Sequence, residues 1–153
     1  MTGEPAPVPT GPVRGRRIGV DVGAVRVGVA LSDPDGLIAT PLVTLARDVA
    51  GGADVRALAE LVAEHEAVGI VVGLPRSLSG QEGHAAGLAR AFADALGAAV
   101  TVPVVFSDER LTTVVATRQL RESGRKGRKQ RAVIDQVAAV GILQGWLDTA
   151  RPR

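Results

Sequence analysis

The 153-residue sequence carries a net charge of +2, with 46% hydrophobic and 22% charged residues, as is typical of one soluble globular domain. No apolar run approaches the ~18 residues that span a membrane, and the N-terminus lacks the basic start and apolar core of a signal peptide, so we expect a cytoplasmic protein. The absence of cysteine excludes disulfides, thiolate metal sites and a cysteine nucleophile.

The first third of the chain predicts a tail followed by three strands. Residues 1–15 hold four prolines and three glycines, which predicts a disordered N-terminal tail, with one folded domain over residues 16–150. Residues 17–33 predict a β-hairpin, because β-branched residues alternate along both halves and Gly23 lies where the chain must turn. A third strand is expected over residues 37–45, where Pro41 indicates an edge or a kink.

The rest of the chain alternates helices and strands. A helix is expected over residues 54–66 with Asp54 as its N-cap, then a strand over 68–74 buried on both faces. A helix over 84–96 and a second buried strand over 100–106 follow. Two helices end the chain, one from Thr112 or Thr113 to about residue 122 and one over 131–149. The order βββαβαβαα predicts an α/β fold, in which a mixed five-stranded sheet carries helices on both faces.

Acidic residues fall at three places that this topology brings to one edge of the sheet. Asp21 interrupts the first strand, Asp108 and Glu109 end the last strand, and Asp135 lies one turn into the final helix. Converging carboxylates repel one another unless a divalent cation neutralises them, and only His65 and His84 could supply imidazole. Carboxylate ligands favour Mg²⁺ or Mn²⁺. Taken singly, each acid also has a structural explanation. Asp21 could as well be a hydrogen-bonded turn anchor as a functional residue. The Asp108–Glu109 pair and Asp135 could be charges at helix starts, which the helix dipole favours.

Positive charge gathers in one segment. Residues 118–131 hold seven basic residues and one acid, which suggests a polyanionic partner such as nucleic acid. The three aromatic residues of the chain are too few for a base-stacking platform. The glycines that follow residues 73–75 resemble a loop that approaches phosphate, although a plain surface loop has the same composition.

Four blocks of sequence resemble the YqgF/RuvX family of Holliday-junction-resolvase-like proteins, also called pre-16S rRNA nucleases. They span about residues 17–147 and comprise Gly19-Val-Asp-Val-Gly with Arg26-Val-Gly-Val-Ala and Ser32-Asp33; Gly73-Leu-Pro with Gly80; Asp108-Glu-Arg-Leu-Thr-Thr113; and Ile134-Asp-Gln-Val-Ala-Ala139 with Ile142-Leu-Gln144.

This resemblance implies a ribonuclease H-like fold and a cytoplasmic, divalent-metal-dependent nuclease that trims the 5′ end of 16S ribosomal RNA precursor. It implies catalytic, metal-binding roles for Asp21, Glu109 and Asp135, whereas Asp108 is the less certain member of its pair. Where the family often has a basic residue, this chain has Val25, so Arg26 is the only cation in that turn. The expected substrate-binding residues are Arg26, Arg110, Arg125, Lys126, Arg128 and Lys129.

Three hypotheses remain open on sequence alone. The first is a metal-dependent nuclease that acts on structured RNA, with four-way DNA junctions as the alternative substrate and a homodimer as a plausible state. The second is a non-catalytic RNA-binding factor in ribosome assembly. The third is a phosphate-binding half of an actin-like or sugar-kinase fold, which is disfavoured because those enzymes need two such domains.

Overall fold

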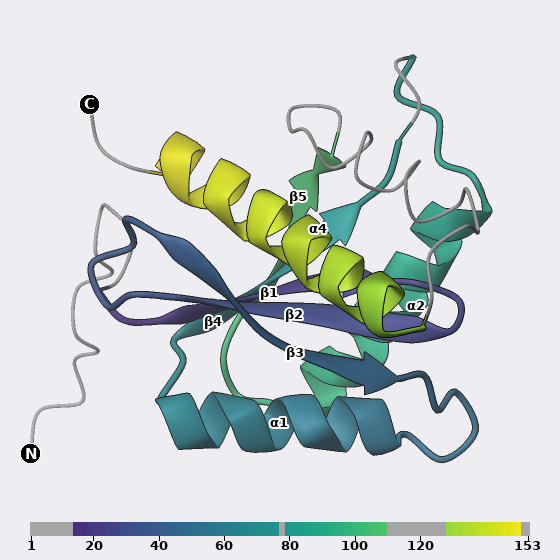
Figure 1. Ribbon diagram of the computed structural model, residues 1–153, viewed down its shortest axis with the longest axis horizontal. Helices are drawn as coiled ribbons and strands as arrows, with labels where there is room; N and C mark the ends of the chain where they lie inside the picture. The colour runs from purple at the N-terminus through teal and green to yellow at the C-terminus, as the bar shows by residue number, and fades with distance from the viewer. Residues whose placement is uncertain (1–13, 77–78, 110–127, 151–153) are drawn as a thin grey trace, which may run out of the picture.

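The computed structural model describes residues 14–76, 79–109 and 128–150 (Figure 1). Its five-stranded sheet has the order β3-β2-β1-β4-β5. The β1–β2 and β2–β3 pairs are antiparallel, and the β1–β4 and β4–β5 pairs are parallel, so the predicted mixed sheet is confirmed. The strands are β1 (Arg17–Val22), β2 (Arg26–Ser32), β3 (Ala39–Ala46), β4 (Gly69–Leu74) and β5 (Val104–Asp108).

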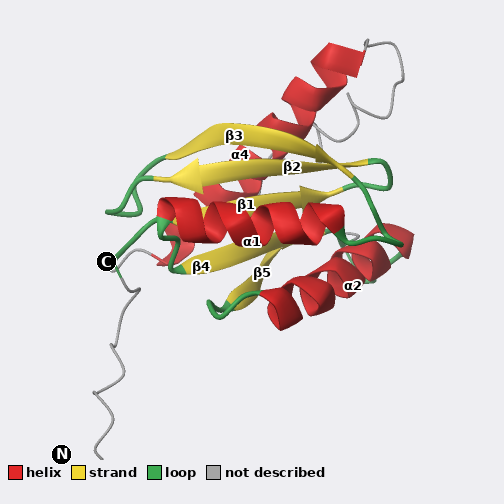
Figure 2. Ribbon diagram, turned by 90° about the horizontal axis from the view of Figure 1, so that it is seen from below, coloured by secondary structure: helices red, strands yellow, loops and turns green. Residues whose placement is uncertain are grey.

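Helices cover both faces of this sheet, as expected (Figure 2). Helices α1 (Ala53–His65) and α2 (His84–Ala99) lie on one face, and α4 (Arg128–Ala150) crosses the other. The helix expected between Thr112 and residue 122 lies outside the described residues, as do residues 1–13 of the expected tail. At the start of the described chain, the Gly15 N–H donates to the Pro34 carbonyl (2.9 Å).

The two faces bury different side chains. The α1/α2 face packs large aliphatic and aromatic residues, among them Leu58, Phe92 and Leu96, against the β-branched residues of the inner strands. The core on the α4 face includes several alanines: Ala138 and Ala139 of the helix and Ala30 and Ala39 of the sheet. A Cβ on Gly19 would come within 2.6 Å of the Leu143 Cβ, so glycine permits this close approach.

Helix α4 is fixed on the sheet by polar contacts to β3 and its preceding turn. The Thr44 hydroxyl donates to the Ala132 carbonyl (2.7 Å) and accepts from the Gln136 amide (3.0 Å). The Gln144 amide accepts from the Ala39 N–H and donates to the Leu37 carbonyl, both at 2.9 Å. These bonds hold both halves of the helix, and with it Asp135, in a set register over the strands.

Three expectations about the last strand and the final helix were wrong. The last strand is not buried, because it forms the edge of the sheet and leaves Val105 and Phe106 each 37% exposed. The final helix begins at Arg128, so Arg128 and Lys129 belong to its first turn instead of to a loop. Asp135 therefore lies about two turns into α4, not one, and helix-entry charge no longer explains it.

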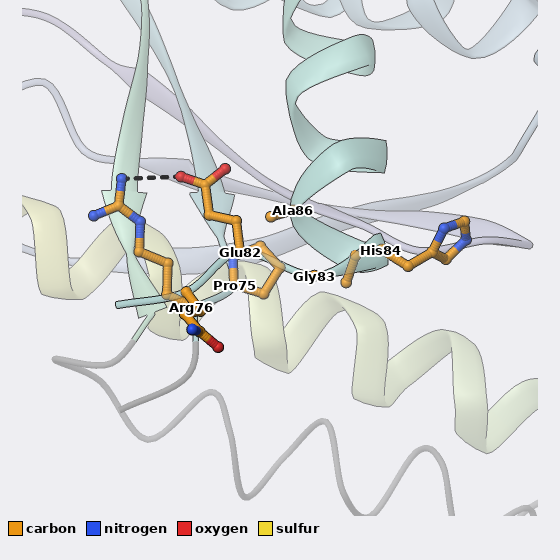
Figure 3. Close-up of a pocket in the computed structure, with 8 residues that line it drawn as sticks. Pro75, Arg76, Glu82, Gly83, His84 and Ala86 are labelled. Carbon is orange, nitrogen blue, oxygen red and sulfur yellow. Dashed lines mark ion pairs between the residues drawn. The ribbon is translucent and has the colours of Figure 1, made fainter. Parts of the chain in front are cut away.

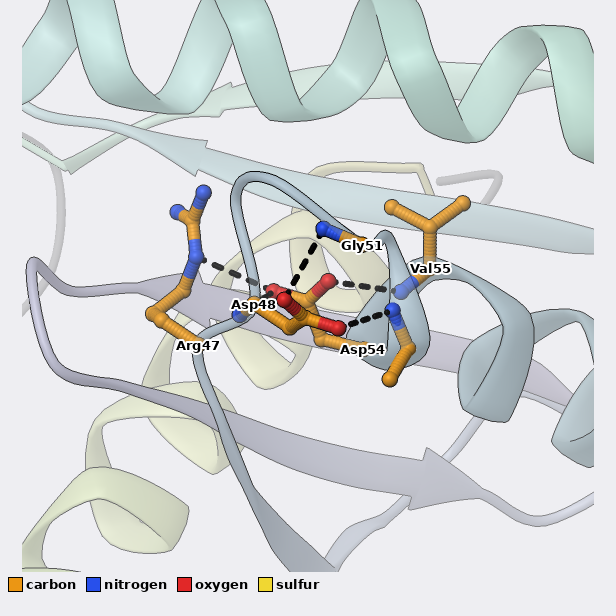
Figure 4. A network of polar contacts seen from close by, with 6 residues as sticks. Arg47, Asp48, Gly51, Asp54 and Val55 are labelled. Atoms are coloured by element: carbon orange, nitrogen blue, oxygen red, sulfur yellow. Dashed lines mark hydrogen bonds and ion pairs between the residues drawn. The ribbon is translucent and has the colours of Figure 1, made fainter.

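Asp54 is also not the N-cap of α1. Gly52 occupies that position with a left-handed backbone (φ 72°) and no side-chain cap. The preceding Asp48 carboxylate accepts from the N–H groups of Gly51 (2.9 Å) and Ala53 (3.0 Å). Asp54 instead lies buried inside the first turn, where it pairs with Arg47 (Nε–Oδ2 3.0 Å) and accepts from the Val55 N–H (2.9 Å; Figure 4).

Candidate active site

Asp135 lies against the cross-strand neighbour of Asp21, where α4 crosses the first hairpin. Asp21 is fully buried in β1, and its cross-strand partner in β2 is Gly28. A Cβ on Gly28 would overlap the Asp135 backbone carbonyl and would lie 3.1 Å from the Asp135 Cβ. Glycine at this position therefore lets α4 bring Asp135 against the strand next to Asp21.

Asp21 points to the α4 face of the sheet. Side chains two residues apart on a strand share a face, and Gly19, two residues earlier, lies against Leu143 and Ala139 of α4. An apolar side chain at this position would simply extend the buried core. The carboxylate is therefore a buried charge on the face where the other two predicted acids lie.

Glu109 lies on the same face, at the β5 edge of the sheet. It follows β5 directly, and its side chain is 2% exposed. A Cβ on Gly73 of β4 would come within 2.6 Å of the Glu109 Oε1 atom. Its carboxylate thus lies over β4, the parallel neighbour of β1, and Gly73 leaves the space that it occupies. Asp108, the last residue of β5, is more exposed.

Arg26 supplies a positive charge to this group. Its Nε lies 2.6 Å from the Asp135 Oδ2 atom, and the side chains are 22% and 2% exposed. Within the described ranges, no set of three acidic or imidazole side chains lies in an arrangement that could hold a metal ion. The Asp135 oxygen thus has a guanidinium partner, and the three carboxylates do not form a ready cluster.

The chemistry of these donors still fits a hard divalent cation. Three buried carboxylates on one face offer only oxygen atoms, which Mg²⁺ and Mn²⁺ prefer. Gathering such charges away from water is unfavourable unless cations compensate them. Arg26 compensates Asp135, and a bound cation would compensate the group as a whole.

The expected substrate-binding residues are only partly described. Arg26 lies in the site, and the backbone places Arg128 and Lys129 in the first turn of α4, the same helix that carries Asp135. Arg110, Arg125 and Lys126 lie outside the described residues, so their roles stay predictions.

Sequence reasoning missed Arg76. This residue follows β4 and Pro75, and its guanidinium lies between Glu82 (Nη2–Oε2 3.3 Å) and Asp108 (Nη1–Oδ2 3.6 Å). The signal was present, because a cation directly after a buried strand lies at the edge where α/β sites form.

Comparison with known proteins shows the family of the chain. A family model described as RuvX, Holliday junction resolvase, matches residues 15–149. The chain belongs to the RuvX family. The resemblance found in its motifs is therefore confirmed over nearly the whole sequence.

Relatives in the RuvX family are similar along most of their length. A protein of Rhodococcus erythropolis (strain PR4), provisionally named pre-16S rRNA nuclease, is 59% identical over 141 residues, which are 90% of this chain and 80% of that protein. A protein of Mycobacterium sp. (strain KMS) with the same provisional name is 60% identical over 141 residues, covering 92% and 83% of the two chains.

Solved structures confirm the predicted ribonuclease H-like fold. RuvC from T. thermophilus, in complex with a Holliday junction substrate, superposes with a TM-score of 0.52 at 15% identity, covering 91% of this chain and 99% of that one. A second structure of Thermus thermophilus RuvC gives 0.51 at 13% identity, with 88% and 95% coverage. No helix in the described ranges is long and apolar enough to cross a membrane.

Proposed function

We propose that this RuvX-family chain is a divalent-metal-dependent nuclease that hydrolyses phosphodiester bonds of the 16S ribosomal RNA precursor, at its 5′ end, in the cytoplasm. The observation that carries the proposal is the approach of Asp135 to Gly28, the cross-strand partner of Asp21. This approach supports the proposal, because it brings the Asp135 backbone against the residue paired with the buried Asp21, in a chain whose relatives bear the name pre-16S rRNA nuclease.

Asp21, Glu109 and Asp135 would hold Mg²⁺ or Mn²⁺ in this proposal. Such an ion activates a water nucleophile and stabilises the leaving oxygen of a phosphodiester. The chain's own contribution is to fix the carboxylates on rigid strands and on a helix, with Gly28 and Gly73 as the points of close approach. Arg26 balances the charge of Asp135, and its partly exposed guanidinium would contact the phosphate backbone.

Two other functions have observations in their favour. The description of the family model, Holliday junction resolvase, favours branched DNA as the substrate, for which a homodimer would match the two-fold symmetry. The ion pair between Arg26 and Asp135 and the lack of a ready three-ligand cluster among the described residues favour a non-catalytic RNA-binding factor in ribosome assembly.

A cleavage assay separates these functions. Purified protein is incubated with labelled 16S precursor RNA and with a four-way DNA junction, with Mg²⁺, Mn²⁺ or EDTA, beside the Asp21→Asn variant. We expect RNA cleavage that needs the cation and falls more than about 10³-fold in the variant, since metal-assisted charge stabilisation contributes several kcal/mol. Cleavage of the junction alone would select the DNA substrate, and RNA binding without cleavage by either protein would select the assembly factor.

A further inference from the structure

A pocket of about 390 Å³ opens beside the proposed active site (Figure 3). Its walls come from the segment after β4 and from the start of α2: Pro75, Arg76 and residues 81–86. The pocket is next to the carboxylates, because β4 ends in the strand segment that Glu109 covers, and Arg76 also pairs with Asp108. A nucleic-acid strand bound at the carboxylates would therefore pass close to this pocket.

Arg76 is held less tightly than the other cation of this network. Its two ion pairs measure 3.3 Å to Glu82 and 3.6 Å to Asp108. By contrast, the Arg90 guanidinium donates to both carboxylate oxygens of Glu82, at 2.6 and 2.7 Å. A bidentate pair of this kind is the stronger arrangement. Arg76 is thus the exchangeable partner of Glu82.

Glu82 remains compensated when Arg76 leaves. It is the only carboxylate among the described residues that line the pocket, and the hydrogen bonds from Arg90 lower its pKa. Releasing Arg76 therefore leaves no carboxylate there without a partner. The Nε atom of Arg76 is buried and makes no hydrogen bond among the described residues. Its side chain as a whole is 30% exposed, so the guanidinium can be reached from solvent.

Figure 3 shows how the pocket is arranged around this cation. Arg76 and Glu82 face each other at one end, and His84 points away from them at the other. An arginine fork matches the oxygens of a phosphate in the same way as it matches a carboxylate. A phosphodiester entering the pocket would thus replace the Glu82 carboxylate on Arg76 with a ligand of similar geometry.

We infer that Arg76 binds a phosphate of the nucleic-acid strand beside the scissile phosphodiester, and that Glu82 is an intramolecular competitor for its guanidinium. The inference rests on the proposed function for the identity of the strand. It makes Arg76 a substrate-binding residue and gives the pair Glu82–Arg90 a tuning role: Glu82 weakens the phosphate contact, and Arg90 limits how strongly Glu82 does so.

The first test is equilibrium binding of labelled 16S precursor RNA by the full chain in EDTA, over a series of KCl concentrations. We expect Arg76→Gln to weaken binding about tenfold at moderate salt, as for one hydrogen-bonded charge. It should also reduce the slope of log K against log [KCl] by about 0.7 to 0.9, the value for one phosphate contact. Arg14→Gln is the matched control, because Arg14 pairs with Asp35 at the surface, and should change neither quantity.

The second test uses the sign of the Glu82→Gln effect. Removing the competitor should tighten binding a few-fold, whereas the loss of a purely structural bridge would weaken it. Because any lost acid reduces repulsion with the RNA, Glu60→Gln supplies the baseline: Glu60 is an exposed acid of α1 and does not line the pocket. The tightening beyond this baseline should vanish in the double variant with Arg76→Gln, as coupling requires.

Three results would overturn the inference: an unchanged salt slope in Arg76→Gln, weaker binding by Glu82→Gln, or an equal Glu82→Gln effect with and without Arg76. If Arg76→Gln does not fold, Arg76→Lys keeps the charge without the planar fork and should bind with intermediate affinity. Failure of the proposed function would appear separately, as absence of cleavage by the wild type, because these measurements read binding alone.

Discussion

In the part of the chain that the structure describes, an arginine–aspartate pair lies on each face of the sheet, and the two pairs differ in their surroundings. On the α1/α2 face, Arg47 pairs with Asp54 at 3.0 Å, is 11% exposed and lies over the Phe92 ring at 5.1 Å. On the α4 face, Arg26 pairs with Asp135 at 2.6 Å and is 22% exposed. The first arginine is enclosed by protein, whereas the second has access to water.

The two aspartates also differ in what surrounds their carboxylates. Asp54 also accepts from the N–H groups of Val55 and Asp48, at 2.9 and 3.2 Å, and so fixes the entry to α1 (Figure 4). Asp135 lies over Gly28, beside Asp21, on the face that collects the other buried acids. One chemical pair thus stabilises the fold on one face, and on the other it compensates a carboxylate that we assign to catalysis.

The largest expected effect comes from removing the acid of each pair. Asp54→Ala should lower the free energy of unfolding by about 3–5 kcal/mol, because Arg47 would remain as a buried charge without its partner. Asp135→Ala should cost only about 1–2 kcal/mol, because Arg26 can turn to solvent, yet it should abolish RNA cleavage. Urea unfolding and the cleavage assay measure the two outcomes, and equal losses of stability would show that the faces do not differ in this way.

Removing the cation of the second pair should sharpen the contrast. Arg26→Gln removes the competing guanidinium from the Asp135 Oδ2 atom, so Mn²⁺ should bind about fivefold tighter in calorimetry without RNA, as for a partly exposed pair of about 1 kcal/mol. Arg56→Gln on α1 is the control and should leave the affinity unchanged. Weaker Mn²⁺ binding by Arg26→Gln would mean that Arg26 supports the ion site instead of competing with it.

The smallest effect concerns the loop that supports the first pair. Hydrogen bonds from the Ala53 and Gly51 N–H groups lower the pKa of Asp48 below its ordinary value of 3.8. A lowered carboxyl pKa stabilises the fold above the unfolded pKa, and this contribution is lost as the pH falls through the folded value. The wild type should therefore melt slightly above Asp48→Asn near neutral pH, and the difference should disappear in acid. A difference that grows on acidification would contradict this.

Sequence patterns predicted the elements whose burial is regular. The alternation around Ile18 and Val29 and the apolar run before Pro75 correctly indicated strands, because strands that are buried on both faces leave few alternatives. The edge position of Pro41 was also correct: it pairs on β3, with a register shift beside Ala30 of β2.

The errors occurred where tertiary contacts decide. Aspartate before an apolar helical repeat is typical of an N-cap, so Asp54 was assigned that role. In the structure its carboxylate is instead buried in an ion pair with Arg47, seven residues earlier, which the helical pattern does not include. The edge strand β5 is as apolar in sequence as an inner strand, and only the sheet order distinguishes them. Predicting that Asp21, Glu109 and Asp135 share one face needed the topology. The ion pairs of Arg76 with Glu82 and Asp108 depend on side-chain positions, which the spacing of residues in the sequence does not predict.

The most direct measurement is the location of Mn²⁺ in crystals of the wild-type protein, from its anomalous scattering. We expect the ion on the α4 face, bound by Asp21 together with Glu109 or Asp135, with the Arg26 guanidinium displaced from the Asp135 carboxylate. Manganese bound elsewhere, or an α4 face that holds no ion at saturating Mn²⁺ while Arg26 stays on Asp135, would contradict the assignment of this face as the active site.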